Sequence, residues 1–206
     1  MIRNVSACVL LFALGGLVLV AQTPPSQDRP SLSMVVVLDH SGSMAGVKMN
    51  LAKEATKATL DLLRDKDSFG VLTFDYSFKW TLQLAEIQNR LDMRMAIDGI
   101  AAMGNTNIYP ALLEAYQRLQ AAPGPTKHII LLSDGQTPAE NFQTLASEML
   151  NNKITVSTVA VTAASDRTLM ENIARWGGGR AYYVENPERI PEIFRNETQL
   201  AGGRRN

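Results

Sequence analysis

Residues 34–43 read MVVVLDHSGS, and this stretch decides the fold. The run from Met34 to Leu38 is continuous, β-branched and apolar, which is typical of a strand covered on both faces, as in a parallel sheet. The run stops at Asp39, and Asp39, Ser41 and Ser43 then place an oxygen-bearing side chain at every second position. The stretch therefore predicts a buried strand that ends in a polar loop.

A helix is predicted directly after this loop. Apolar residues recur at helical spacing through residues 51–62, which indicates an amphipathic helix packed on a sheet. We expect Lys48, Lys53 and Lys57 on its solvent side. A strand followed by such a helix is the first half of a parallel crossover.

The same alternation continues along the chain. Strands are predicted at residues 68–74, 79–84, 128–132, 154–161 and 180–184, and helices at 86–100, 110–119, 142–150, 167–175 and 187–195. Because only residues 75–78 separate the strands at 68–74 and 79–84, these two must be antiparallel neighbours, and the second is expected at an edge. The predicted fold class is therefore α/β, with a doubly wound, mostly parallel sheet, one antiparallel edge strand and helices on both faces.

Composition limits the class of protein. The 206 residues are 46% hydrophobic and 19% charged, which fits one globular domain. Twenty basic and twenty acidic residues give a formal net charge of zero, so no electrostatic surface for nucleic acid is expected. The single cysteine, Cys8, lies in the N-terminal apolar run, so we expect no disulfide, zinc cluster or thiol nucleophile in the folded part, and stability from packing alone.

The N-terminal residues 1–21 are predicted to be a signal peptide or an N-terminal membrane anchor. Residues 5–21 are almost entirely apolar and follow Arg3, and their length lies between that of a secretory signal and that of a membrane span. Leu19 is large for the position three residues before a cut after Ala21, which favours an uncleaved anchor. We therefore expect an exported protein, anchored in the cell membrane and facing the periplasm or the outside, or secreted if the segment is cleaved.

The rest of the chain divides into three parts. Residues 22–30 are rich in proline and polar residues and are interpreted as a linker, residues 31–198 as the domain, and residues 199–206 as a polar tail.

Two predicted strands end in an aspartate. Asp39 follows the strand at 34–38, and Asp134 follows the strand at 128–132 and Ser133. Ligands of open α/β sheets bind beyond the carboxyl ends of the strands, where the strand order reverses. If these two strands are neighbours at the reversal, both carboxylates face one crevice.

The residues at these ends form a known motif. Asp-x-Ser-x-Ser at 39–43, Thr106 in the Gly-rich loop 104–107, and Asp134 followed by glycine resemble the metal-ion-dependent adhesion site of von Willebrand factor A (VWA) domains. The resemblance implies a Rossmann-like fold and one divalent cation, with Ser41, Ser43 and Thr106 as direct ligands and Asp39 and Asp134 holding the metal through water.

The resemblance extends over the whole chain after the linker, including residues 127–135 and 154–161. It is closest to the bacterial membrane-associated branch of the family, in which such domains sit beside membrane spans in larger proteins. A truncated relative and a fragment of a longer protein both fit a chain that ends at Asn206.

The ligand set indicates the metal and the function. Hydroxyl and carboxylate oxygens are hard ligands that suit Mg²⁺, Mn²⁺ or Ca²⁺ rather than zinc or copper. Neutral hydroxyls leave the ion electron-poor, so that it can accept a carboxylate from another protein. We therefore expect a metal-ion-dependent protein-binding module for adhesion or complex assembly, without catalytic residues, whose partner protein offers an Asp or Glu side chain.

Enzymatic readings fit the residues less well. A Mg²⁺-dependent phosphoryl-transfer hydrolase would use Asp39 as the nucleophile, but it typically needs a second carboxylate two residues on, where Ser41 stands. An acyl-transfer enzyme would need a Gly-x-Ser-x-Gly turn, which neither Ser41 nor Ser43 has, and His40 and His128 have no evident partners.

The third alternative is a metal-independent structural module in which Asp39, Ser41 and Ser43 only cap a turn. Asn105 and Asn107 are interpreted as loop-shaping or capping residues, and residues 177–179 (Gly-Gly-Gly) as a tight turn. Asp75, Tyr76 and Trp80 could form part of a partner surface, although a charge at a hairpin tip and an aromatic residue on an edge strand need no such explanation.

Overall fold

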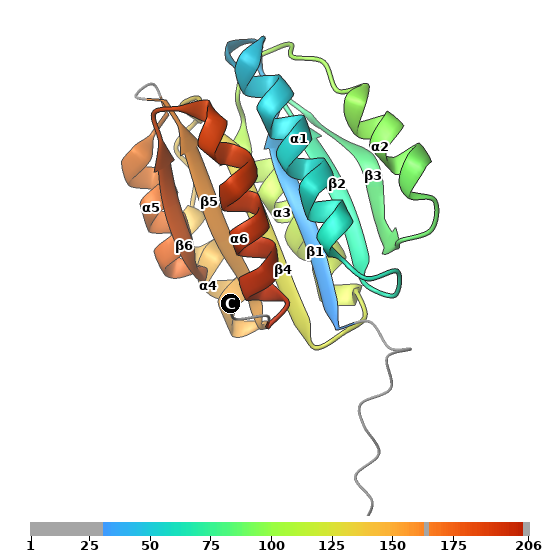
Figure 1. Ribbon diagram of the computed structural model, residues 1–206. Helices are drawn as coiled ribbons and strands as arrows, with labels where there is room; N and C mark the ends of the chain where they lie inside the picture. The colour runs from blue at the N-terminus through green and yellow to red at the C-terminus, as the bar shows by residue number, and fades with distance from the viewer. Residues whose placement is uncertain (1–30, 163–164, 204–206) are drawn as a thin grey trace, which may run out of the picture.

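The computed structural model describes residues 31–162 and 165–203 (Figure 1). In chain order its elements are β1 (Leu32–Asp39), the 3-10 turn η1 (Gly42–Met44), α1 (Val47–Leu62), β2 (Ser68–Phe74), β3 (Phe78–Glu86), α2 (Arg90–Asp98), α3 (Ile108–Ala121), β4 (Thr126–Ser133), α4 (Phe142–Asn151), β5 (Ile154–Val161), α5 (Arg167–Trp176), β6 (Gly178–Val184), the 3-10 turn η2 (Pro187–Arg189) and α6 (Ile190–Ala201). The predicted anchor and linker lie outside the described residues. Within the described ranges, no helix is both long and apolar enough to span a bilayer.

The strands form one six-stranded sheet in the order β3-β2-β1-β4-β5-β6. Every neighbouring pair is parallel except β2 and β3, which are antiparallel and place β3 at the edge. The predicted fold class is therefore confirmed. The chain leaves β1 toward β2 and β3 on one side and returns to β4 on the other, so the strand order reverses between β1 and β4.

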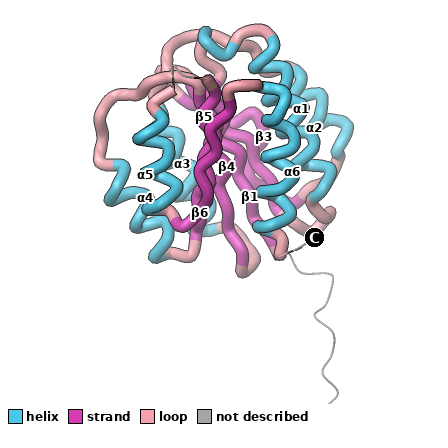
Figure 2. The backbone as a smooth tube through the Cα atoms, turned by 60° about the vertical axis from the view of Figure 1, so that its left-hand side comes forward, coloured by secondary structure: helices cyan, strands magenta, loops and turns pink. Residues whose placement is uncertain are grey.

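Helices cover both faces of the sheet (Figure 2). Because side chains alternate along a strand, Met34, Val36 and Leu38 of β1 pack in a core with α1, α2 and α6, whereas Val35 and Val37 pack in a second core with α3, α4 and α5. All five side chains are fully buried. Burial on both faces explains why the strand is a continuous apolar run.

The helix predicted at 86–100 is shorter than expected. Glu86 pairs with Ser68 as the last residue of β3, and α2 begins only at Arg90. The side chain of Asn89 accepts hydrogen bonds from the backbone N–H groups of Leu91 and Asp92 and so caps the helix. The apolar pattern alone could not separate the end of the edge strand from the start of the helix.

The C-terminal helix also differs from its prediction. The segment predicted at 187–195 divides into η2 and α6, and α6 continues to Ala201. The glycines at 177–179 lie at the junction of α5 and β6 as predicted, but Gly178 and Gly179 already belong to the strand.

The expectation that the three lysines of α1 face solvent is wrong for Lys57. Its side chain is mostly buried and pairs with Glu54 and Asp98, the second of which lies at the end of α2. Lys53 follows the prediction more closely, because its Nζ donates to the backbone carbonyl of Asp98 at an exposed position. The packing of α2 beside α1 therefore covers part of a face that the sequence of α1 alone marks as polar.

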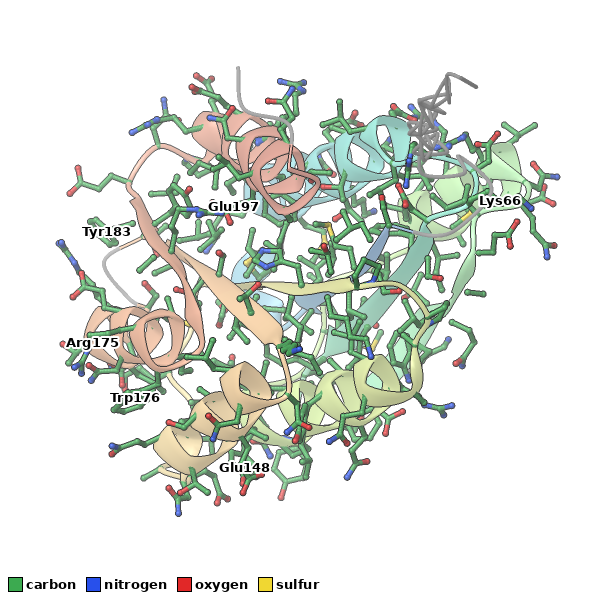
Figure 3. The ribbon with its side chains drawn as sticks, turned by 90° about the horizontal axis from the view of Figure 1, so that it is seen from below. Lys66, Glu148, Arg175, Trp176, Tyr183 and Glu197 are labelled. Carbon is green, nitrogen blue, oxygen red and sulfur yellow. The ribbon has the colours of Figure 1, made fainter. Side chains whose placement is uncertain are left out.

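A buried cluster of polar and charged side chains lies within the packing that composition leads us to expect. Glu197 on α6 is completely buried beneath the helix, where Figure 3 shows it on the side facing the sheet. Arg180 donates to its carboxylate through Nε at 2.6 Å and Nη2 at 3.0 Å, Tyr182 donates through its hydroxyl, and His128 Nε2 lies 3.5 Å away. This cluster links α6 to β4 and β6.

Burial raises the pKa of Glu197, but hydrogen bonds from its neighbours outweigh burial and lower the pKa from 4.5 to about 2. Since the folded pKa lies below the unfolded one, the ionised carboxylate stabilises the fold above pH 4.5, and this contribution is lost as the pH falls toward 2.

We expect Glu197→Gln to reduce the free energy of unfolding at pH 7 by about 2 kcal/mol, less than the full pKa difference implies because the Arg180 side chain is 47% exposed. Urea unfolding measures this difference, which should shrink as the pH is lowered from 4.5 toward 2. Glu192→Gln, at an exposed position in the first turn of α6, is the matched control. Equal losses in both variants, or a difference independent of pH, would contradict the assignment.

Candidate metal centre

The two strand-end aspartates lie side by side. In the parallel pairing of β1 with β4, Leu38 is opposite Leu132, so Asp39 and Asp134 follow adjacent strands at the strand reversal. Both residues are almost completely buried. The two carboxylates therefore follow neighbouring strands at the same edge of the sheet, where the carboxyl ends of β1 and β4 lie at the top in Figure 1.

The first loop turns its polar atoms toward these carboxylates. The backbone N–H of Ser41 donates to Asp39 Oδ1 at 2.8 Å, and the hydroxyls of Ser41 and Ser43 are 3.0 Å apart. Ser43 Oγ donates to Asp134 Oδ1 at 2.6 Å. Four of the five predicted site residues thus form one continuous chain of hydrogen bonds.

Thr106, the fifth residue, lies against the Asp134 loop. A Cβ placed on Gly135 would be 2.5 Å from Thr106 Oγ1, so only a glycine allows this approach. The two Gly-containing loops are also joined, because the N–H of Gly42 donates to the carbonyl of Gly104 at 3.0 Å. The structure therefore brings all five predicted residues together from three loops.

The Gly104 backbone has a φ of 75°, a conformation that favours glycine. A Cβ at this position would also be 2.6 Å from Asp75 Oδ2, in the turn between β2 and β3. The carbonyl of Asp75 accepts the N–H of Asn107 at 2.7 Å. Asp75 thus fixes the loop that carries Thr106, a role that the sequence did not reveal.

Ser133 is a second residue that the sequence analysis missed. Its Oγ donates to Asp39 Oδ2 at 2.6 Å, so both oxygens of the Asp39 carboxylate accept hydrogen bonds. Burial raises the pKa of Asp39, the bonds from Ser133 and Ser41 lower it in part, and the nearby Asp134 charge raises it further. The net pKa of Asp39 is raised, chiefly because burial disfavours the charged carboxylate, and the repulsion from Asp134 adds only a small part.

Lys48 is the third missed residue and contradicts its predicted position in solvent. It lies in the first turn of α1, its side chain is 21% exposed, and its Nζ contacts Asp134 Oδ2. Positive charge in the first turn of a helix is unfavourable with respect to the helix dipole. That misplacement is the sequence signal that could have indicated a carboxylate partner for Lys48.

The remaining polar candidates lie outside the cluster. His40 Nδ1 is 3.0 Å from the carbonyl of Ala101 and makes no hydrogen bond to the five candidate residues in the part of the chain that the structure describes. Asn107 occupies the N-cap position of α3, but its side chain makes no capping hydrogen bond, so of its two predicted roles the loop-shaping one fits. Trp80 donates to Glu114 on α3 at 2.9 Å, which accounts for this aromatic residue on the edge strand.

The donor atoms fit a hard divalent cation. The described ranges contain no group of three or more His, Cys, Asp or Glu side chains able to hold a metal, so any centre here needs the hydroxyls. Two buried carboxylates and the hydroxyls of Ser41, Ser43 and Thr106 supply oxygen donors from three loops. The hydroxyl of Thr106 has no hydrogen bond to any other described side chain, which leaves its lone pairs available.

Exposed apolar side chains surround the same edge. Val47, Tyr76 and Met103 are 65%, 75% and 57% exposed, and they follow η1, β2 and α2, respectively, in the loops or helix start next to the site. A cleft of about 400 Å³ begins at His40 and Met103 and extends along β3 to Trp80. Apolar groups around a buried polar site are typical of surfaces that bind other proteins.

Comparisons with known proteins agree with this architecture. The chain is 30% identical over 181 residues to the uncharacterized protein sll0103 of Synechocystis, covering 85% of this chain and 43% of that protein. It is 37% identical over 122 residues to human inter-alpha-trypsin inhibitor heavy chain H2, covering 54% of this chain and 13% of that protein. The chain thus spans less than half the length of either relative.

Solved structures give the same result. A von Willebrand factor type A protein from Catenulispora acidiphila has a TM-score of 0.74 and 28% identity, over 85% of this chain and 43% of that one. Proximal thread matrix protein 1 of the mussel byssus, with a zinc-occupied MIDAS motif, has a TM-score of 0.74 at 20% identity, over 84% of this chain and 46% of that one, a likeness of fold. The family model for the von Willebrand factor type A domain matches residues 33–196, and the chain therefore belongs to that family.

Proposed function

We propose that this domain binds a protein partner through one divalent cation held by Asp39, Ser41, Ser43, Thr106 and Asp134. Domains of this family are generally non-enzymatic modules that bind protein partners. The observation that carries the metal-dependent form of this function is the convergence of two buried carboxylates and three hydroxyls at the strand reversal.

The positions of the side chains support a separate role for each. Ser41 and Ser43 present their hydroxyls together, and Thr106 approaches from the opposite loop. Asp39 is held at both oxygens by Ser133 and the backbone of Ser41, so it is fixed in orientation and supplies charge. Bound at this position, Mg²⁺, Mn²⁺ or Ca²⁺ would supply a Lewis-acidic point for a carboxylate of the partner.

The surroundings support a protein as the partner rather than a small anion. The exposed side chains of Val47, Tyr76 and Met103 offer apolar contact area around the polar centre. An interface of this kind combines an apolar contact region with one well-placed polar anchor. An acidic side chain projecting from a complementary surface satisfies both requirements.

The hydrolase alternative lacks support in the site. The residue two positions after Asp39 is Ser41, whose hydroxyl contacts Ser43 rather than any group able to act as an acid or base. Both oxygens of Asp39 also accept hydrogen bonds, which weakens a nucleophile. The second alternative, a protein-binding module that needs no metal, is distinguished by the binding experiments below.

We further propose that the protein is exported, anchored in the cell membrane by residues 5–21 or secreted after their cleavage. The support is the apolar run behind Arg3 in the sequence. Fusion of residues 1–30 to a reporter that is active only outside the bacterial cytoplasm should give activity, and Leu10→Arg with Leu17→Arg should abolish it. A reporter without activity would exclude export by this segment.

Residues 30–206 should bind one Mg²⁺ or Mn²⁺ in calorimetric titration, and Thr106→Val and Asp39→Asn should each weaken binding at least tenfold, because each removes an oxygen donor or a charge from the site. Zn²⁺ belongs in the same series, since zinc occupies the motif of the mussel protein. Thr168→Val, an exposed change on α5, is the matched control. Unchanged affinity in both site variants would refute the five-residue centre.

Partner chemistry can be tested without knowing the partner. Peptides selected from a random display library on the Mg²⁺-loaded domain and released with EDTA should share an Asp or Glu, because the metal position accepts a carboxylate. The same selection on Asp39→Asn should not enrich them. Enriched peptides without acidic residues, or peptides that stay bound in EDTA, would favour the metal-independent module.

A further inference from the structure

The ammonium of Lys48 is part of the charge balance of the metal centre. Its Nζ contacts Asp134 Oδ2, while the other oxygen of the same carboxylate accepts a hydrogen bond from Ser43 at 2.6 Å. Asp134 is 1% exposed and Lys48 21% exposed, so water screens this pair only in part. In the described ranges, Lys48 is the single cation paired with either aspartate of the site.

Lys48 lies where a positive charge destabilises its helix. Lys48 is the second residue of α1, where the N-terminal end of the helix repels positive charge by about 0.3–1 kcal/mol. No acidic residue in that first turn compensates for it. The contact with Asp134, which directly follows β4, is what holds the ammonium at this edge of the sheet.

Lys48 changes the net charge of the loaded metal centre. Asp39 and Asp134 alone would be neutralised by one divalent cation, so the loaded centre would have no net charge to attract an anion. With the Lys48 ammonium beside Asp134, the loaded centre keeps one net positive charge. The same ammonium repels the incoming divalent cation.

We propose that Lys48 sets the net charge of the metal centre. It thereby weakens the affinity of the empty centre for the divalent cation and strengthens the affinity of the loaded centre for a carboxylate. This inference rests on the proposed function, because it concerns the same site. It assigns to Lys48 a positioning and charge-setting role that the five-residue motif does not include.

The test compares Mn²⁺ binding by residues 30–206 with binding by three variants of the same protein. Bound Mn²⁺ is measured from the electron paramagnetic resonance signal of the free ion. Lys48→Met removes the charge and keeps the length, and we expect it to bind Mn²⁺ about tenfold more tightly. Lys48→Arg keeps the charge and should stay close to the native affinity. Lys53→Met, on the same helix but bonded to the carbonyl of Asp98, should not change it.

A second measurement uses acetate as the carboxylate probe at saturating Mn²⁺, followed by water-proton relaxation. Acetate should bind the Lys48→Met protein several-fold more weakly than the native protein, and equal binding would overturn the anion half of the proposal. Thermal unfolding in EDTA confirms that each variant is folded before titration.

The outcomes separate this inference from the proposed function. Tighter Mn²⁺ binding by Lys48→Met, including binding by that variant alone, supports the inference. Native Mn²⁺ binding with equal or weaker binding by Lys48→Met overturns the role of Lys48 and leaves the metal centre intact. Absence of Mn²⁺ binding in every folded protein overturns both.

Discussion

The parallel pairing of β1 with β4 is the constraint on which the rest of the structure depends. It places Asp39 and Asp134 next to each other at the strand reversal, and it requires helices on both faces of the sheet because β1 is buried on both. A shift of one residue in this register would turn Val35 and Val37 toward the opposite core and separate the two carboxylates. Fold and site are thus set by the same pairing.

Two neighbouring buried carboxylates are unfavourable on their own, and the surrounding residues show how the fold tolerates them. Ser133 and the backbone of Ser41 bind Asp39, while Ser43 and Lys48 bind Asp134. Similar compensation occurs at Glu197, where Arg180 and Tyr182 satisfy a buried carboxylate under α6. The difference is that Glu197 is enclosed by its partners, whereas the Asp39 and Asp134 cluster lies at an open edge among the exposed side chains of Val47 and Met103.

Membership of the von Willebrand factor type A family explains the architecture, and the local chemistry gives the proposed function its specific form. This chain matches only part of the length of its relatives, so similar domains occur within longer proteins of different size. In this chain, the centre lies next to the ammonium of Lys48 and near the exposed side chains of Val47, Tyr76 and Met103, and the cleft along β3 begins beside it.

The sequence by itself determined the fold class, the antiparallel edge strand and the five candidate residues, because continuous apolar runs, a link of four residues and a spaced motif are local signals. Only the tertiary structure decided that Asp39 and Asp134 are neighbours, that Ser133 and Asp75 support the site, and that Lys48 and Lys57 leave the solvent face of α1. Each of these depends on a residue far away in the chain. Periodicity describes which face of one helix is polar, but the charge that a lysine meets is set by the elements packed against it.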